Sequence, residues 1–337
     1  MAVIEQQAPI QGLPLWPWGY AAASVVAIAA VLVAPLAVYV FTIAVLGIPH
    51  VVCELRYCDQ RFSARAPRSA VLAIGVLLIG IAGLRIAQGA DALGARIAVP
   101  VELFAGVALT AAALWFMPRR RLLGAAIGCA ITVGAVYAPI STFLVFAWLH
   151  NLSPLGFFAE VLGRRERRST LIALLVPFIL VPAVIASGVL QGAMRDWLGY
   201  SVATGPSLFG AGRSVLGAYL NGGAFSAALP LFSAAVAAQV MHYFSVIVVM
   251  PQILQRQAGA EVAPSLVRWP SWRSLYIGLA AFGVAMGAFN AIDYATARKV
   301  YGVAAAIHSW LELPIFLIAL GAGFGAVTPI GARPATS

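Results

Sequence analysis

The stretch YAAASVVAIAAVLVAPLAVYVFTIAVLGIPHVVCEL, residues 20–55, decides the fold class, because its only charged residue is Glu54. One helical crossing of a membrane needs about 20 apolar residues, so this run is longer than one crossing requires. Apolar runs recur along the rest of the chain, at 69–88, 98–117, 122–138, 140–162, 169–192, 224–254, 273–292 and 301–325. The pattern predicts an all-α fold, a polytopic transmembrane helical bundle.

Composition supports the same fold class. The chain is 62% hydrophobic and 9% charged, whereas soluble proteins carry about 25% charged residues. The apolar runs are spread evenly, so we predict a single integral membrane domain over residues 1–337. The net charge of +10 lies mainly in arginines between the apolar runs. There it indicates membrane topology and contact with lipid headgroups, and no nucleic-acid partner is expected.

The arginines predict how the chain crosses the membrane. They cluster after four of the runs, at Arg56, Arg61, Arg65 and Arg68, at 119–121, at 164–168, and at Arg256, Arg268 and Arg273. Loops rich in arginine face the cytoplasm. About 8–10 spans are expected, and a count of about nine places all four loops inside, the N-terminus outside and the C-terminus in the cytoplasm. The expected location is the inner (cytoplasmic) membrane. Residues 193–223 would form a long extracytoplasmic loop or a re-entrant segment; ten spans with the N-terminus inside is the alternative.

The chain has four histidines, and each lies in a different apolar run: His50, His150, His242 and His308. Polar side chains inside a membrane are costly and commonly mark functional sites. Imidazoles from four helices can surround one metal ion or a haem, and we predict that these four are metal ligands. Iron, copper and zinc all accept imidazole, and Fe(II) with open coordination positions suits reaction with dioxygen.

Several polar residues lie close to these histidines in the sequence. Glu54 follows His50 by four residues, and Glu312 follows His308 by four, a spacing that places both side chains on one helix face. Each carboxylate can hold an imidazole in orientation or bind the metal itself. Further candidates for the surrounding shell are Gln239, Tyr243 and Asn151. Two other acidic residues, Glu102 and Glu160, are expected at the membrane interface.

The segment GIPHVVCE, residues 47–54, resembles the GLPHGxxD element of the Brp/Blh family, the membrane β-carotene 15,15′-dioxygenases. Gly47, Pro49 and His50 match that element, and Glu54 stands where the family has aspartate. The resemblance implies a multi-helix membrane enzyme that holds iron with histidines, with His50 as a ligand and Glu54 as its supporting carboxylate. It also implies oxidative cleavage of a carotenoid. Val51 departs from the family's glycine, and a later histidine pair one helical turn apart is missing from this sequence.

Three functions follow as expectations. The first is a histidine-liganded iron oxygenase that cleaves a lipophilic, carotenoid- or polyene-like substrate with dioxygen. The second is a haem-binding electron-transfer or haem-modifying protein, and the third is a transporter or a non-catalytic subunit of a membrane complex. A shared metal requires the histidines to lie at one depth. The nine-span arrangement instead places His50 near the cytoplasmic end of its span and His308 nearer the outer side.

Overall fold

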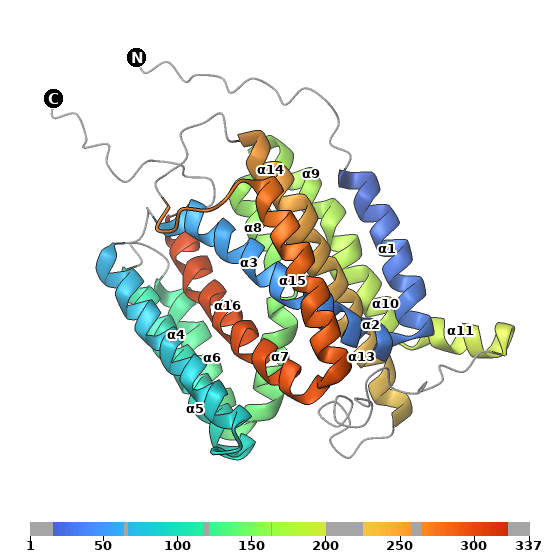
Figure 1. Cartoon of the computed structure of the whole chain (residues 1–337), viewed down its shortest axis with the longest axis horizontal. Helices are drawn as coiled ribbons and strands as arrows, with labels where there is room; N and C mark the ends of the chain where they lie inside the picture. The colour runs from blue at the N-terminus through green and yellow to red at the C-terminus, as the bar shows by residue number, and fades with distance from the viewer. Residues whose placement is uncertain are drawn as a thin grey trace.

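The fold is entirely helical in the part of the chain that the computed structural model describes, residues 16–63, 67–116, 121–162, 164–199, 225–257 and 265–322. Eight helical segments are long and apolar enough to cross a membrane, and two shorter apolar helices accompany them, Trp18–Val33 and Arg121–Tyr137. The predicted polytopic helical bundle is therefore confirmed (Figure 1).

The first apolar run forms two antiparallel segments. Helix α1 (Trp16–Val33) ends at Ala34, whose backbone leaves the helical region at φ −146° and ψ 62°. Pro35 then occupies the first turn of the next helix, where its missing N–H costs no hydrogen bond. The second segment comprises α2 (Pro35–Phe41), the π-helical turn η1 (Thr42–Leu46), α3 (Gly47–Cys58) and the π-helical turn η2 (Asp59–Ser63).

The remaining segments run alternately up and down the bundle. They are α4 (Arg68–Gly89), α5 (Ala95–Phe116), α6 (Arg121–Tyr137), α7 (Pro139–His150) with α8 (Ser153–Val161), α9 (Arg164–Leu175) with η3 (Val176–Leu180) and α10 (Val181–Ala186), α13 (Phe225–Phe244) with η4 (Ser245–Val249) and α14 (Met250–Gln257), α15 (Trp272–Ile292) and α16 (Tyr294–Ala322). The helical hairpin predicted around Ala138 and Pro139 is present.

This division changes the predicted topology. Splitting the first run adds an antiparallel helical segment, so the start of α1 and the end of α16 lie at the same end of the bundle (Figure 1). The nine-span arrangement would have placed them at opposite ends. The division also moves His50 from a span's end to the middle of Pro35–Phe62. His308 lies midway along α16, so the two histidines share one depth.

Helix α16 lies between the layer formed by α4, α5 and α6 and the helices that carry the other histidines (Figure 1). A close approach to α5 depends on Gly106, because a Cβ atom there would overlap the ring of Trp310. The indole of Trp310 donates a 2.8 Å hydrogen bond to Glu102 on α5, and Arg85 on α4 forms an ion pair with the same carboxylate at 2.7 Å. Glu102 is thus buried between helices and paired with a cation, and Glu160 is likewise buried against Arg61.

The predicted loop or re-entrant segment at 193–223 is described only at its start. Residues up to Leu198 belong to α11 (Val189–Leu198), which has no buried residue and ends at Gly199 with φ +62°. Residues 200–224 lie outside the described residues.

Candidate metal centre

His50 and His308 are each anchored by their own helix. The Nδ1 atom of His50 lies 3.3 Å from the carbonyl oxygen of Leu46, and Nδ1 of His308 lies 3.0 Å from that of Ala304. A carbonyl oxygen only accepts hydrogen bonds, so Nδ1 of each ring carries the proton and donates it. A neutral imidazole has one proton, and the Nε2 atom of each ring is therefore left with a free lone pair.

His150, at the C-terminal end of α7, is held by a carboxylate instead. Its Nδ1 atom lies 2.6 Å from Oε2 of Glu312 on α16. A carboxylate that accepts the Nδ1 proton fixes the ring's orientation and increases the basicity of the opposite nitrogen. The Nε2 atom of His150 thus also presents a lone pair.

The three Nε2 atoms converge on one place. The Nε2 atom of His308 lies 3.0 Å from that of His50 and 3.1 Å from that of His150, and the ligand atoms of all three histidines lie within 4.8 Å of one another. Lone pairs that face each other at this separation repel unless a cation lies among them. The three histidines could therefore hold a metal ion, as their positions in separate runs predicted.

His242, on α13, lies beside this group but not within it. Its ring centroid is 4.7 Å from that of His150 and 5.4 Å from that of His50. Its Nε2 atom lies 3.6 Å from Oε2 of Glu54. All four histidines are thus neighbours, and the fourth faces a carboxylate rather than the three converging nitrogens.

The two glutamates bind across helices instead of along their own. The spacing of four residues predicted contacts of Glu54 with His50 and of Glu312 with His308. Because the Nδ1 atoms of those rings are bonded to their own backbones, Glu54 faces His242 and Glu312 binds His150. The carboxyl groups of Glu54 and Glu312 also lie against each other.

The other predicted residues surround the centre. Tyr243 stacks on the ring of His50 with a centroid distance of 4.0 Å, and its hydroxyl group bonds that of Tyr301 at 2.8 Å. Gln239 donates a hydrogen bond to Thr42, and Asn151 caps the end of α7. Tyr243 therefore orients a histidine, while Gln239 and Asn151 line the space next to the centre.

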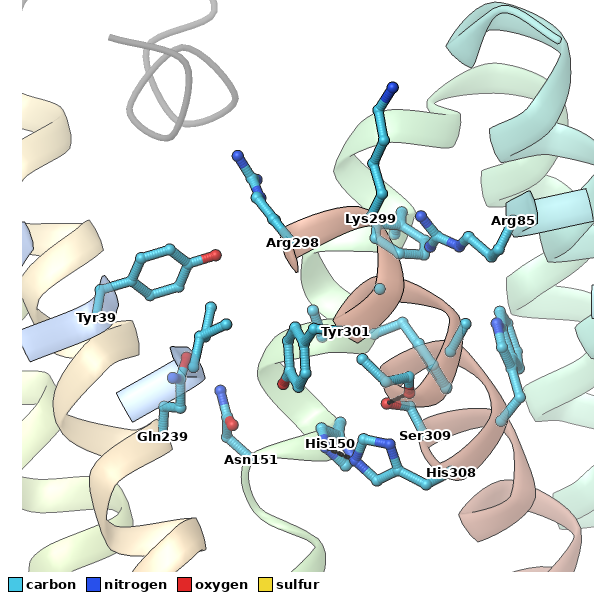
Figure 2. Close-up of a pocket in the computed structure, with 18 of the residues that line it drawn as sticks. Tyr39, Arg85, His150, Asn151, Gln239, Arg298, Lys299, Tyr301, His308 and Ser309 are labelled. Atoms are coloured by element: carbon cyan, nitrogen blue, oxygen red, sulfur yellow. Dashed lines mark hydrogen bonds between the residues drawn. The ribbon is translucent and has the colours of Figure 1, made fainter. Parts of the chain in front are cut away.

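A cavity of about 600 Å³ adjoins His150 and His308. In Figure 2 these two histidines lie at one end of the view, and Arg85, Arg298 and Lys299 lie at the other. The cavity wall includes the apolar aromatic side chains of Phe143, Phe146, Trp148 and Trp310, together with several tyrosines. Four residues of the cavity wall were not predicted from the sequence: Arg85, Arg298, Tyr301 and Trp310. Arg85 alone gave a signal, as a charge within an apolar run.

Comparison with known proteins adds no relative: no protein-family model, no curated protein and no solved structure matches the chain.

Proposed function

We propose that the protein is a membrane-embedded, non-haem iron oxygenase in which His50, His150 and His308 bind Fe(II) through their Nε2 atoms. The observation that carries the proposal is the convergence of three buried nitrogens whose opposite ring nitrogens are all engaged as donors. Anchoring of this kind accompanies almost all histidines that bind metals. A structural role for the histidines would not require their lone pairs to meet.

The spacing of the nitrogens favours a six-coordinate ion. With metal–nitrogen bonds of about 2.1 Å, separations of 3.0 and 3.1 Å correspond to angles of about 90° at the metal. Zinc prefers the wider angles of a tetrahedron, whereas Fe(II) commonly accepts ligands at neighbouring positions of an octahedron, as His308 would be to both His50 and His150. Iron bound there would supply a position at which dioxygen is activated. Cleavage of one carbon–carbon double bond by one dioxygen molecule gives two carbonyl groups, so no other reductant is needed.

The same spacing disfavours a haem between these rings. Two axial nitrogens on opposite faces of a porphyrin lie about 4 Å apart, given iron–nitrogen bonds of about 2 Å. The Nε2 atom of His308 lies closer than that to both of its neighbours, at 3.0 Å from His50 and 3.1 Å from His150. A single small ion is the better fit.

The cavity beside the centre favours a lipophilic substrate that is carotenoid- or polyene-like. Its volume falls in the range of about 300–1,000 Å³ that is typical of small-molecule sites. The aromatic wall suits an apolar chain, and the wall's small residues on α16, among them Gly302, leave room for it. A Cβ atom added at Gly302 would meet no other atom within 4 Å. The Gly302→Trp variant should therefore lose cleavage of β-carotene and keep its iron.

We also propose an orientation. The end of the bundle at which α1 begins and α16 ends carries Arg61, Arg68 and Arg121. By the positive-inside rule this end faces the cytoplasm, so both described chain ends lie on the cytoplasmic side of the membrane. The polar end of the cavity, near the start of α16, then opens toward the opposite side.

Iron content tests the proposal. Protein purified without oxygen, loaded with Fe(II) and desalted should retain iron, and the His50→Ala, His150→Ala and His308→Ala variants should lose it. Asn290→Ala is the control, because Asn290 is equally buried but bonds only its own helix. Undiminished iron in all three histidine variants would contradict the proposal. A wild-type protein that binds no metal would favour the transporter or subunit hypothesis. Iron without turnover of β-carotene would refute the substrate class alone.

A further inference from the structure

Three buried side chains at the centre carry polar atoms without a hydrogen bond. Oε2 of Glu54, Oε1 of Glu312 and both ring nitrogens of His242 lack a hydrogen bond of normal geometry. Polar groups close to them are the backbone of His150 and Asn151 for His242 and the Ser153 side chain for Glu312. Glu54, Glu312 and His242 are 1%, 3% and 0% exposed. An isolated buried carboxylate is highly unfavourable unless a cation or a proton compensates it. Among the ion pairs of the described residues, those of Glu54 and Glu312 involve only histidines.

These unpartnered atoms lie on one side of the three-histidine group. Glu54 is one helical turn beyond His50 on α3, and Glu312 is one turn beyond His308 on α16. Both helices run toward the arginine-rich end of the bundle, so both carboxyl groups are displaced in the same direction (Figure 1). They meet each other there, with His242 of α13 facing Glu54.

The spacing of these donors fits ligands of one ion. Two atoms that each lie about 2.1 Å from a metal are separated by about 3.0–3.6 Å for bond angles between 90° and 120°. The distance of 3.6 Å between Nε2 of His242 and Oε2 of Glu54 falls in this range. It is too long for a hydrogen bond. Carboxylate and imidazole together suit a divalent first-row ion such as Fe(II) or Mn(II).

We propose that Glu54, His242 and Glu312 bind a second divalent cation next to the ion of the three histidines, so that the centre is dinuclear. The inference rests on the proposed function, because it extends the same centre. Glu312 connects the two positions: its Oε2 atom accepts the Nδ1 proton of His150, and its Oε1 atom is free for the second ion. Paired metal ions in proteins lie about 3.5–4 Å apart, and His242 is a direct neighbour of His150, with ring centroids 4.7 Å apart.

The competing arrangement has one ion and a proton shared by Glu54 and Glu312. In that case the two carboxyl groups carry one negative charge between them, and His242 serves only as a packing residue. The number of metal ions distinguishes the two arrangements directly.

The test is metal counting combined with electron paramagnetic resonance. Protein loaded with Fe(II) without oxygen and desalted should hold two ions per chain by mass spectrometry of the metal. Protein loaded with Mn(II) should show the spectrum of two exchange-coupled ions. The Glu54→Gln and His242→Gln variants should each keep one ion and lose the coupling. Asp293→Asn, a carboxyl change at the exposed start of α16, should keep both.

Each outcome separates the two proposals. One ion in the wild-type protein, unchanged in Glu54→Gln and without coupling in the Mn(II) spectrum, would overturn the dinuclear centre and leave the proposed function intact. No bound ion would overturn both. The wild-type count and spectrum decide the matter even if a variant fails to fold.

Discussion

Among the side chains that the structure describes, four glutamates are buried, and they form two contrasting pairs. Glu102 and Glu160 each face an arginine: Glu102 accepts from Arg85 and Trp310, and Glu160 accepts two hydrogen bonds from Arg61. Glu54 and Glu312 have histidines as their ion-pair partners and lie against each other, and each has one oxygen without a hydrogen bond. The same residue type thus serves two purposes. A carboxylate with a fixed cation fastens helices together, whereas one without it is suited to a cation that binds from outside.

The largest effect is expected at His308, because its Nε2 atom is the nearest neighbour of both other converging nitrogens. The His308→Ala variant should lose the iron of the three-histidine position and all oxygenase activity. In the metal-free protein the change should cost little stability, since it also removes a repulsive contact between lone pairs. Metal analysis and thermal unfolding of the same samples test this. Severe destabilisation of the metal-free variant would assign His308 a structural role.

The arginine-paired region, meaning Glu102 with Arg85 and Glu160 with Arg61, should respond in the opposite way: substitution there should lower stability and leave the iron content unchanged. The Arg85→Gln variant leaves Glu102 buried without its cation, which costs about 3–5 kcal/mol of stability. Iron content should stay at the wild-type value in the protein that remains folded. Unfolding by denaturant in detergent measures the loss, and the double variant Arg85→Gln with Glu102→Gln should recover part of it. If folded Arg85→Gln protein lost its iron, the arginine-paired region would not be separate from the metal centre.

Glu312 tests how the carboxylate supports a ligand. The Glu312→Gln variant keeps a hydrogen-bond acceptor near Nδ1 of His150 but removes the negative charge. Loss of a carboxylate of this kind commonly reduces metal affinity by about 10–100-fold. Competition with a chelator of known affinity measures the change. The matched variant Glu160→Gln, in the arginine-paired region, should leave the affinity unchanged; equal losses in both would contradict a local effect.

The smallest effect is expected for Glu54→Gln, whose change in stability should have the opposite sign to that of Glu102→Gln. In metal-free protein, Glu54→Gln removes a buried carboxyl group that lacks a cation, so stability should be unchanged or should rise by about 1 kcal/mol. Glu102→Gln should instead lower stability, because it breaks the ion pair with Arg85. Thermal unfolding of the two variants side by side gives the comparison. A loss of stability in both would show that Glu54 is a structural residue like Glu102.

Much of this architecture is predictable from sequence, because apolar runs of helical length have few alternatives. The break at Ala34 and Pro35 was not located, since it lies inside an uninterrupted apolar stretch and two antiparallel helices have the same composition as one long helix. That single break accounts for the different topology and for the common depth of His50 and His308.

The residues of the centre could be predicted from the sequence, but the contacts among them could not. Four histidines in four separate runs indicated a shared centre, and three of them converge. The pairing of the glutamates was wrong because a spacing of four residues describes only one helix, whereas Glu54 and Glu312 face neighbouring helices. The ion pair of Glu102 with Arg85 was not predicted, because Arg85 lies on another helix and the contact depends on tertiary packing.

X-ray absorption at the iron edge tests the central claim most directly, because it reports the atoms that surround the metal. For Fe(II)-loaded protein we predict nitrogen and oxygen ligands at about 2.1 Å together with the outer-shell scattering of imidazole rings. That scattering should weaken in the His308→Ala variant. Bound iron without imidazole scattering, or with a spectrum unchanged by His308→Ala, would contradict a metal centre built on these histidines.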